Sequence, residues 1–405
     1  MPGGRAALLI AFGIDNLGSG LFLPLTLVFV TQVVGLTVAE AGLSVMIGTL
    51  AGLAVPAVAG SLVDRVGERA VVIAAQLLQA VGAGTYLLAH GILLVVAAAV
   101  LTAAGQQLFY SALFGLIADT AGDDPKDHAF TVVGMVRAAT FAIGAMVAGA
   151  LLSTTGPTGY RWAITVDVIS FVIAAAVLAL GLGALGTSSP ALPKGTTPPS
   201  EVVISRVLRD RPYLALIAVT TLFALSGDFF LVGVPVYSLE VLRTPPWLPG
   251  ALLTLITVMG ATMGTLVLRW TRRWSRIKAM QIAATATTLW CAASAAAALL
   301  PSAWTTGYLL GCAVLLAAAQ LVSTGRINAL AEAAAPRRSR ARYLAAFQYA
   351  FTIAGVLAPA VVALFSVTPW LPWLVVAAGT AASVGGLRYV SKHLPAHAHG
   401  IADQS

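Results

Sequence analysis

Long apolar segments recur along the whole chain and constrain its fold more than any other feature. Of the 405 residues, 59% are hydrophobic and only 9% are Asp, Glu, Lys or Arg. A soluble chain usually needs charge on about a quarter of its residues. The sequence therefore predicts that most of the protein is surrounded by lipid rather than by water.

Each apolar segment is expected to be a helix, because backbone polar groups in hydrocarbon must form hydrogen bonds within their own segment. Twelve spans of roughly 20 residues with short loops account for the length. We place these spans at residues 6–33, 41–63, 70–88, 92–117, 129–154, 160–184, 212–240, 248–270, 278–299, 303–333, 341–366 and 370–390. The expected fold class is an all-α membrane protein.

A polar segment rich in proline and serine, residues 186–211, divides the predicted spans six and six. Its composition is typical of a semi-extended linker. It separates an N-terminal six-helix bundle at 1–185 from a C-terminal bundle at 212–392, which is followed by a tail at 393–405. Similar short sequences occur at matching places in the two halves. Such duplication predicts two pseudo-symmetric bundles and a transporter with its site between them.

Basic residues are concentrated in alternate gaps between the predicted spans. The remaining gaps contain only Arg161 and Arg243. Because cytoplasmic loops carry an excess of Lys and Arg, both termini and the linker are expected in the cytoplasm. The net charge of +8 is thus interpreted as a topology signal and not as a sign of nucleic-acid binding.

The gap after the second predicted span contains a motif. Residues 60–69 read Gly-Ser-Leu-Val-Asp-Arg-Val-Gly-Glu-Arg. This segment resembles motif A of the major facilitator superfamily, except that Glu68 stands where a basic residue is usual. The resemblance implies the major facilitator fold, with twelve helices in two bundles, and it is closest to bacterial efflux proteins of the drug:proton antiporter type. It also implies a multi-pass protein of the bacterial plasma (inner) membrane.

The same resemblance implies a conformational latch, because in the family this loop holds the two halves in the outward-facing state. The residues concerned are Gly60, Asp64, Arg65, Gly67 and Arg69. The alternative is a cytoplasmic turn without a switching role. Gly144 and Gly149 are similarly ambiguous: they resemble a weakened antiporter motif, and they also suit ordinary packing of small residues between helices.

Charged residues within the predicted spans are functional candidates, because a charge at the bilayer centre costs at least ~2.5–3.5 kcal/mol. Asp15 and Arg137 lie about equally deep in spans that run in the same direction. We therefore hypothesise an Asp15–Arg137 ion pair, either switching with protonation or permanent. Asp167 is expected to form a structural hydrogen bond.

Asp228 lies near the middle of the seventh predicted span, without an acidic or basic partner in its own segment. Taking up a proton would remove the cost of a lone charge there, so Asp228 is a candidate proton site. Alternatively, it could face a cationic substrate with Phe229 or Phe230 alongside. A water-exposed acid without a dedicated role is the third possibility.

Uncharged polar and aromatic residues could line a pocket for varied amphipathic molecules. The residues that we select for substrate binding or proton coupling, besides the charged ones, are Gln106, Gln107, Tyr110 and Gln348. Packing between helices is the alternative role for such side chains.

Together these features predict a secondary active transporter that exports a small hydrophobic or cationic molecule by alternating access, coupled to proton influx. No ATP-binding loop, catalytic motif or spacing of metal ligands is found in the sequence. We therefore expect no enzyme activity, no cofactor and no metal. The expected partners are the substrate, protons and membrane lipid, and the expected state is a monomer. Uptake of a nutrient or metabolite, or a non-transporting membrane sensor on the same fold, are the alternatives.

Overall fold

The computed structural model describes residues 2–121, 126–181, 209–323, 325–336 and 340–394. Within these ranges every regular element is a helix, so the expected all-α class agrees with the structure. Most of the predicted linker at 186–211 and of the predicted tail at 393–405 lies outside the described residues.

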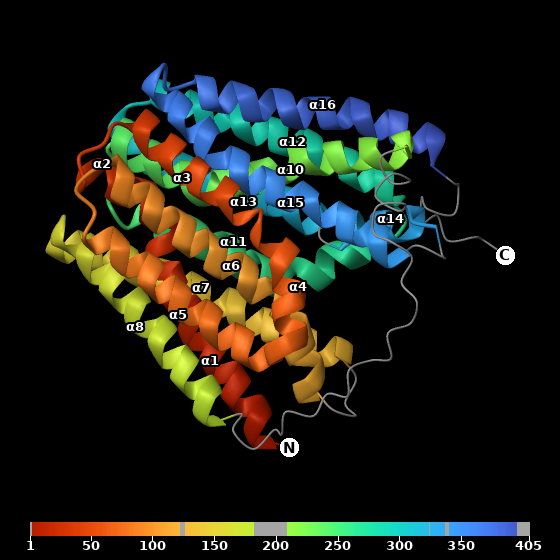
Figure 1. The fold of residues 1–405 in the computed structure, drawn as a ribbon. Helices are drawn as coiled ribbons and strands as arrows, with labels where there is room; N and C mark the ends of the chain where they lie inside the picture. Colours follow the sequence, from red (N-terminus) through yellow and green to blue (C-terminus); the bar gives the residue numbers. More distant parts are fainter. Residues whose placement is uncertain (1, 122–125, 182–208, 324, 337–339, 395–405) are drawn as a thin grey trace. The chain divides into compact units, whose positions relative to one another are not determined.

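The helices follow the apolar segments of the sequence closely (Figure 1). In the first half they are α1 (Pro2–Phe22), η1 (Leu23–Leu25), α2 (Thr26–Gln32), α3 (Val38–Gly52), α4 (Val55–Val66), α5 (Glu68–Leu87), α6 (Ile92–Ala121), α7 (Lys126–Thr155) and α8 (Thr158–Gly181). In the second half they are α10 (Arg211–Val236), η2 (Tyr237–Val241), α11 (Leu248–Trp270), α12 (Arg276–Ala296), η3 (Ala297–Leu299), α13 (Ser302–Ser323), α14 (Arg326–Ala334), α15 (Arg340–Ala363), η5 (Leu364–Ser366) and α16 (Leu371–His393).

Eleven helical segments of the described chain are long and apolar enough to cross a membrane. The expected second span, 41–63, is instead formed by two consecutive helices, α3 and α4. Pro56 lies in the first turn of α4. Because proline lacks a backbone N–H, it is favoured at the start of a helix and interrupts one that runs through it.

The start of α3 is fixed by a capping box. The Thr37 hydroxyl accepts a hydrogen bond from the Glu40 N–H at 3.2 Å, and the Glu40 carboxylate accepts from the Thr37 N–H at 2.8 Å. These bonds satisfy N–H groups that have no partner within the helix. The Thr37 N–H and then its hydroxyl hold the pKa of Glu40 below its ordinary value.

The chain packs as two compact units. Unit 1 comprises Met1–Pro193 and Val234–Thr254, and unit 2 comprises Lys194–Gly233 and Leu255–Ser405. The expected bundles at 1–185 and 212–392 would place Val234–Thr254 in the second bundle. This segment packs in unit 1 because its small residues contact α7, where a Cβ on Gly250 would lie 2.2 Å from the carbonyl oxygen of Ala145.

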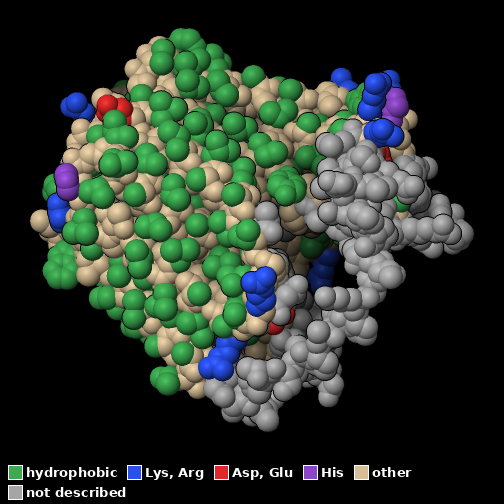
Figure 2. Space-filling view, viewed as in Figure 1, with side chains coloured by type: hydrophobic (Ala, Val, Ile, Leu, Met, Phe, Trp, Pro, Cys, Tyr) green, Lys and Arg blue, Asp and Glu red, His purple; other side chains and the backbone are tan. Residues whose placement is uncertain are grey.

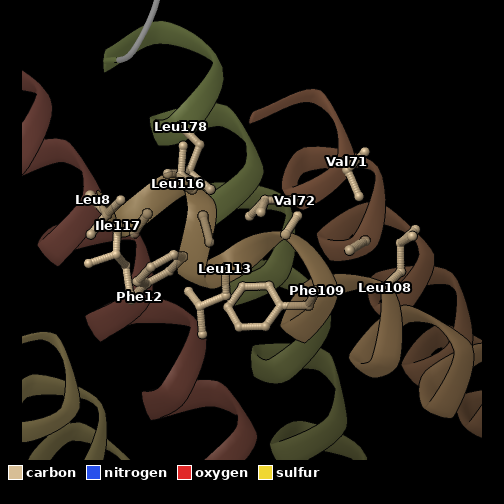
Figure 3. Packing of buried hydrophobic residues seen from close by; sticks show 14 of the residues in the cluster. Leu8, Phe12, Val71, Val72, Leu108, Phe109, Leu113, Leu116, Ile117 and Leu178 are labelled. Atoms are coloured by element: carbon tan, nitrogen blue, oxygen red, sulfur yellow. The ribbon is translucent and has the colours of Figure 1, made fainter. Parts of the chain in front are cut away.

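The core of unit 1 is an apolar cluster contributed chiefly by α1, α5, α6 and α8 (Figure 3). Phe12 of α1 meets Phe109 of α6 edge to face, with ring centroids 5.4 Å apart. Leu178 of α8 and Val72 of α5 belong to the same cluster. In lipid such contacts stabilise through close packing, because lipid tails are as apolar as the side chains themselves.

Unit 2 has its own core, in which tyrosine and tryptophan are buried. Tyr213 of α10 donates to the carbonyl of Tyr343 in α15 at 3.0 Å. Trp290 of α12 and Trp373 of α16 meet edge to face with centroids 5.3 Å apart. The aromatic rings thus join α12 and α16, which pack closely against each other.

Large apolar side chains are exposed in both units. Trp304 is 73% exposed and Leu299 is 87% exposed. On the face shown in Figure 2, hydrophobic side chains predominate and few charged side chains interrupt them. A soluble monomer rarely exposes apolar surface on this scale, so this surface suits contact with lipid.

Glycines permit the close approach of α1 and α7. A Cβ on Gly144 would lie 2.1 Å from the carbonyl oxygen of Leu17, and a Cβ on Gly20 would lie 2.1 Å from that of Phe141. Contacts of this kind leave no room for a side chain. The structure therefore gives Gly144 a packing role between α1 and α7.

We predict that Gly144→Ala lowers thermal stability while Gly134→Ala does not. Gly134 lies on the same helix, α7, and a Cβ there meets nothing within 4 Å. Overpacking at Gly144 should cost about 1–3 kcal/mol, whereas alanine at position 134 should gain up to about 1 kcal/mol of helix propensity. Melting curves of the purified proteins in detergent measure the difference. Equal melting temperatures for the two variants would contradict the assigned packing.

Candidate functional site

Asp15 lies inside unit 1 and is only 5% exposed. The neighbouring Asn16 amide donates to the Asp15 carboxyl at 3.3 Å and to the carbonyl of Phe12 at 2.9 Å. The Arg137 guanidinium of α7 and the Gln76 side chain of α5 are close enough to interact electrostatically with the Asp15 carboxyl group. Three helices thus contribute polar groups around one buried acid.

Arg137 contacts aromatic rings rather than Asp15. Its Nη2 donates to the Tyr110 hydroxyl at 2.9 Å. Its guanidinium carbon lies 5.5 Å from the ring centroid of Phe109 and 5.3 Å from that of Tyr110, which is cation–π geometry. The expected direct Asp15–Arg137 ion pair is therefore not formed. The matching depth brings the two charges within Coulombic range, but a hydroxyl and two rings of α6 hold the guanidinium.

Asp167 of α8 lies close to the same region and is 4% exposed. Its Oδ1 is buried without a hydrogen-bond partner among the described residues. The bond at this position is made by the Ser170 hydroxyl, which donates to the Asp167 backbone carbonyl at 2.7 Å. The expected structural hydrogen bond of the Asp167 side chain is thus not present in the described chain.

Polar residues also occupy an accessible face of α6. Gln106 is exposed, Gln107 is half-buried, and Tyr110 is 39% exposed. Gln106 and Tyr110 are four residues apart, so they share one face of the helix. The Tyr110 hydroxyl therefore both holds Arg137 and remains accessible.

In unit 2, Asp228 of α10 lies beside Gly355 of α15. A Cβ on Gly355 would lie 3.9 Å from Asp228 Oδ2. Asp228 is half-buried and makes no hydrogen bond or ion pair with another described residue. Gln348 is exposed and precedes Gly355 by seven residues, which places the two on the same face of α15.

The suggested cation–π partners of Asp228 are turned into the core. Phe229 is fully buried, with its ring centroid 5.0 Å from that of Trp373, and Phe230 contacts Trp290 at 6.1 Å. The expectation that either phenylalanine flanks a cationic substrate at Asp228 is therefore wrong. Consecutive residues of a helix point in different directions, and the aromatic core takes these two rings.

The predicted latch comprises the end of α4, the connecting Gly67 and the start of α5. Gly60 and Asp64 lie within α4, and the structure does not describe their surroundings or the Asp64 side chain. Gly67 has φ +81° and ψ 157°, a conformation that is accessible almost only to glycine. Arg65 is exposed, and the Arg69 guanidinium donates to the carbonyl of Ala179 in α8. Arg69 thus links the start of α5 to the end of α8 within unit 1.

Gln76 was not among the residues predicted from the sequence. Its side chain is fully buried, and neither its Nε2 nor its Oε1 is hydrogen-bonded to a described residue. The only sequence feature that could have identified Gln76 is that its polar amide lies in the middle of an apolar segment. Among the described residues no group of three or more His, Cys, Asp or Glu side chains is placed to hold a metal ion.

A family model described as Major Facilitator Superfamily matches residues 8–359. No curated protein sequence matches the chain. Among solved structures, the chain is similar to a bacterial homologue of the iron transporter ferroportin in an inward-facing state, with TM-score 0.78, 16% identity, and coverage of 96% of this chain and 99% of that one.

Two further similar structures are the nucleoside transporter NupG and a POT family transporter in complex with 5-aminolevulinic acid. The first has TM-score 0.75 and 11% identity, covering 96% of this chain and 99% of that one. The second has TM-score 0.75 and 12% identity, covering 97% and 96%. At such identities these likenesses show a shared fold. The family model covers most of the sequence, and the chain therefore belongs to the major facilitator superfamily of multi-pass membrane transporters.

Proposed function

We propose that the protein exports a small hydrophobic or cationic molecule across the bacterial plasma membrane in exchange for protons, with both termini in the cytoplasm. The observation that carries this proposal is Asp228, an acid within a span that has no partner among the described residues. A permanently charged side chain at that place would cost at least ~2.5–3.5 kcal/mol. A proton or a cationic group of the substrate removes this cost.

Competition between a proton and a cationic substrate for Asp228 leads to exchange of one for the other across the membrane. Because either a proton or a cation neutralises Asp228, binding of one disfavours binding of the other. An inward proton gradient then displaces the cation on the outer side, while loss of the proton on the inner side restores the site. Alternating access between the two sides converts this competition into export.

The accessible polar groups suit a substrate that is mostly apolar. Gln106 and Tyr110 on α6 and Gln348 on α15 each present a polar group on a helix whose neighbouring residues are largely hydrophobic. Sites for small molecules typically combine apolar walls with few polar groups that fix orientation. We assign these residues, with Gln107, to substrate binding.

Arg137 and Asp15 are proposed as a coupled pair that positions Tyr110. Arg137 donates to the Tyr110 hydroxyl, and Asp15 interacts with Arg137 through space. A negative charge at Asp15 helps to hold the guanidinium inside unit 1. In this proposal residues 60–69 act as the latch. The turn at Gly67 and the hydrogen bond of Arg69 to α8 hold this segment in place within unit 1.

Replacing Asp228 tests the proton-coupled function. We expect Asp228→Asn to lose flux driven by a proton gradient in proteoliposomes, because the amide cannot take up and release a proton. Glu40→Gln is the matched control, since it neutralises an acid of the capping box, and glutamine can replace glutamate there. Fluorescent hydrophobic cations serve as the substrate panel, and internal pH is recorded in parallel.

Two results would contradict this proposal. One is gradient-driven flux in Asp228→Asn at the wild-type rate. The other is substrate movement in the wild type that is unaffected when the proton gradient is collapsed. Substrate that accumulates inside cells, rather than leaving them, would instead favour uptake.

A double-mutant cycle tests the electrostatic coupling of Asp15 and Arg137. We expect Arg137→Gln to destabilise the wild type more than it destabilises the Asp15→Asn variant, because the second background lacks the charge with which Arg137 interacts. Residues coupled in this way show interaction free energies of about 0.5–3 kcal/mol. Melting temperatures in detergent give the four values, and strictly additive effects would rule out the coupling.

A further inference from the structure

Four oxygen-bearing side chains of unit 1 lie on α1, α5 and α8, where α8 packs against both α1 and α5 (Figure 1). They are Asp15, Gln76, Asp167 and Ser170, which we call the oxygen cluster. All four are at most 5% exposed.

The oxygen cluster has unsatisfied polar atoms. Both amide atoms of Gln76 and the Oδ1 atom of Asp167 are buried without a hydrogen-bond partner among the described residues. Most buried polar groups in proteins have a partner, and leaving one without a partner costs about 1–3 kcal/mol. The two oxygens among these atoms, Gln76 Oε1 and Asp167 Oδ1, point to a bound species that takes oxygen ligands.

Gly18 brings the oxygens of α8 against α1. A Cβ on Gly18 would lie 1.9 Å from the Ser170 hydroxyl and 3.0 Å from Asp167 Oδ1. Gly18 follows Asp15 by three residues, so both lie on one face of α1 within a single turn. The absence of a side chain at Gly18 therefore lets Asp167 and Ser170 approach the helix beside Asp15. Gln76 reaches the Asp15 carboxyl group from α5.

The charges of the oxygen cluster are not balanced by a direct partner. Asp15 and Asp167 lie within Coulombic range of each other, so their carboxyl groups repel whenever both are ionised. Arg137 also acts on Asp15, but its guanidinium is held by the Tyr110 hydroxyl and two rings. A positive ion between the acids would remove the repulsion and satisfy the amide oxygen.

We propose that the oxygen cluster binds a hard metal cation, and that Ca²⁺ is the ion whose coordination it fits. Carboxylates, amide carbonyls and hydroxyls are oxygen ligands of the kind that Ca²⁺ accepts at 2.3–2.6 Å in flexible geometry. Mg²⁺ requires nearly ideal octahedral geometry and gives up water reluctantly, so it suits a site between three helices less well. Zinc prefers sulfur and nitrogen, and the cluster contains neither Cys nor His.

Equilibrium binding of Ca²⁺ to the purified full chain in detergent tests this site directly. We expect the wild type to bind Ca²⁺ saturably at one site and to melt at a higher temperature when Ca²⁺ is present. Asp15→Asn and Asp167→Asn should each weaken binding by at least ~10-fold. Glu40→Gln, which neutralises an acid of the same unit outside the oxygen cluster, should bind as the wild type does.

A further variant separates loss of the site from loss of folding. Gln76→Leu removes the unsatisfied amide, so we expect it to melt at or above the wild-type temperature without Ca²⁺ and to lose the shift that Ca²⁺ produces. The proposal is overturned if the wild type shows no saturable Ca²⁺ binding, if Asp167→Asn and Gln76→Leu bind normally, or if Mg²⁺ competes equally. Because no gradient is used, these results are independent of proton-coupled export.

Discussion

The cost of leaving a polar group in hydrocarbon determines how both units are built. Some intramembrane polar groups are satisfied by a neighbouring helix of the same unit, as when Arg137 donates to the Tyr110 hydroxyl and rests against two rings. Helices must approach closely for this, and glycines such as Gly18 and Gly144 permit it. The few groups that remain unsatisfied among the described residues, notably Asp228, Gln76 and Asp167, are then the places where a proton, substrate or ion can act.

Much of the fold was predictable because lipid imposes simple rules on the sequence. The apolar segment expected at 248–270 coincides with α11, since hydrophobicity and length set such boundaries. The break between α3 and α4 was not predicted, because proline is tolerated within membrane helices when neighbours satisfy the freed carbonyl. The association of Val234–Thr254 with unit 1 depends on contacts such as Gly250 with Ala145, which no sequence pattern reveals.

The candidate site was predictable in part. Helix geometry placed Asp15 and Arg137 at equal depth, and the two groups lie within Coulombic range of each other. Which group holds the guanidinium depends on side-chain direction, and Tyr110 of α6 takes that role. Gln76 was missed because an amide in an apolar segment resembles many packing residues, whereas its burial without a partner is visible only in three dimensions. For the same reason, the sequence could not show that Phe229 points into the core.

Protonation of Asp228 is the central claim for function, and infrared spectroscopy of the protein in lipid bilayers tests it most directly. A protonated carboxyl group has a carbonyl stretching band that the ionised form lacks. We predict that the wild type gains such a band as the pH is lowered, that Glu40→Gln gains the same band, and that Asp228→Asn does not. An identical pH-dependent band in Asp228→Asn would contradict the account, because the proton would then reside on another group.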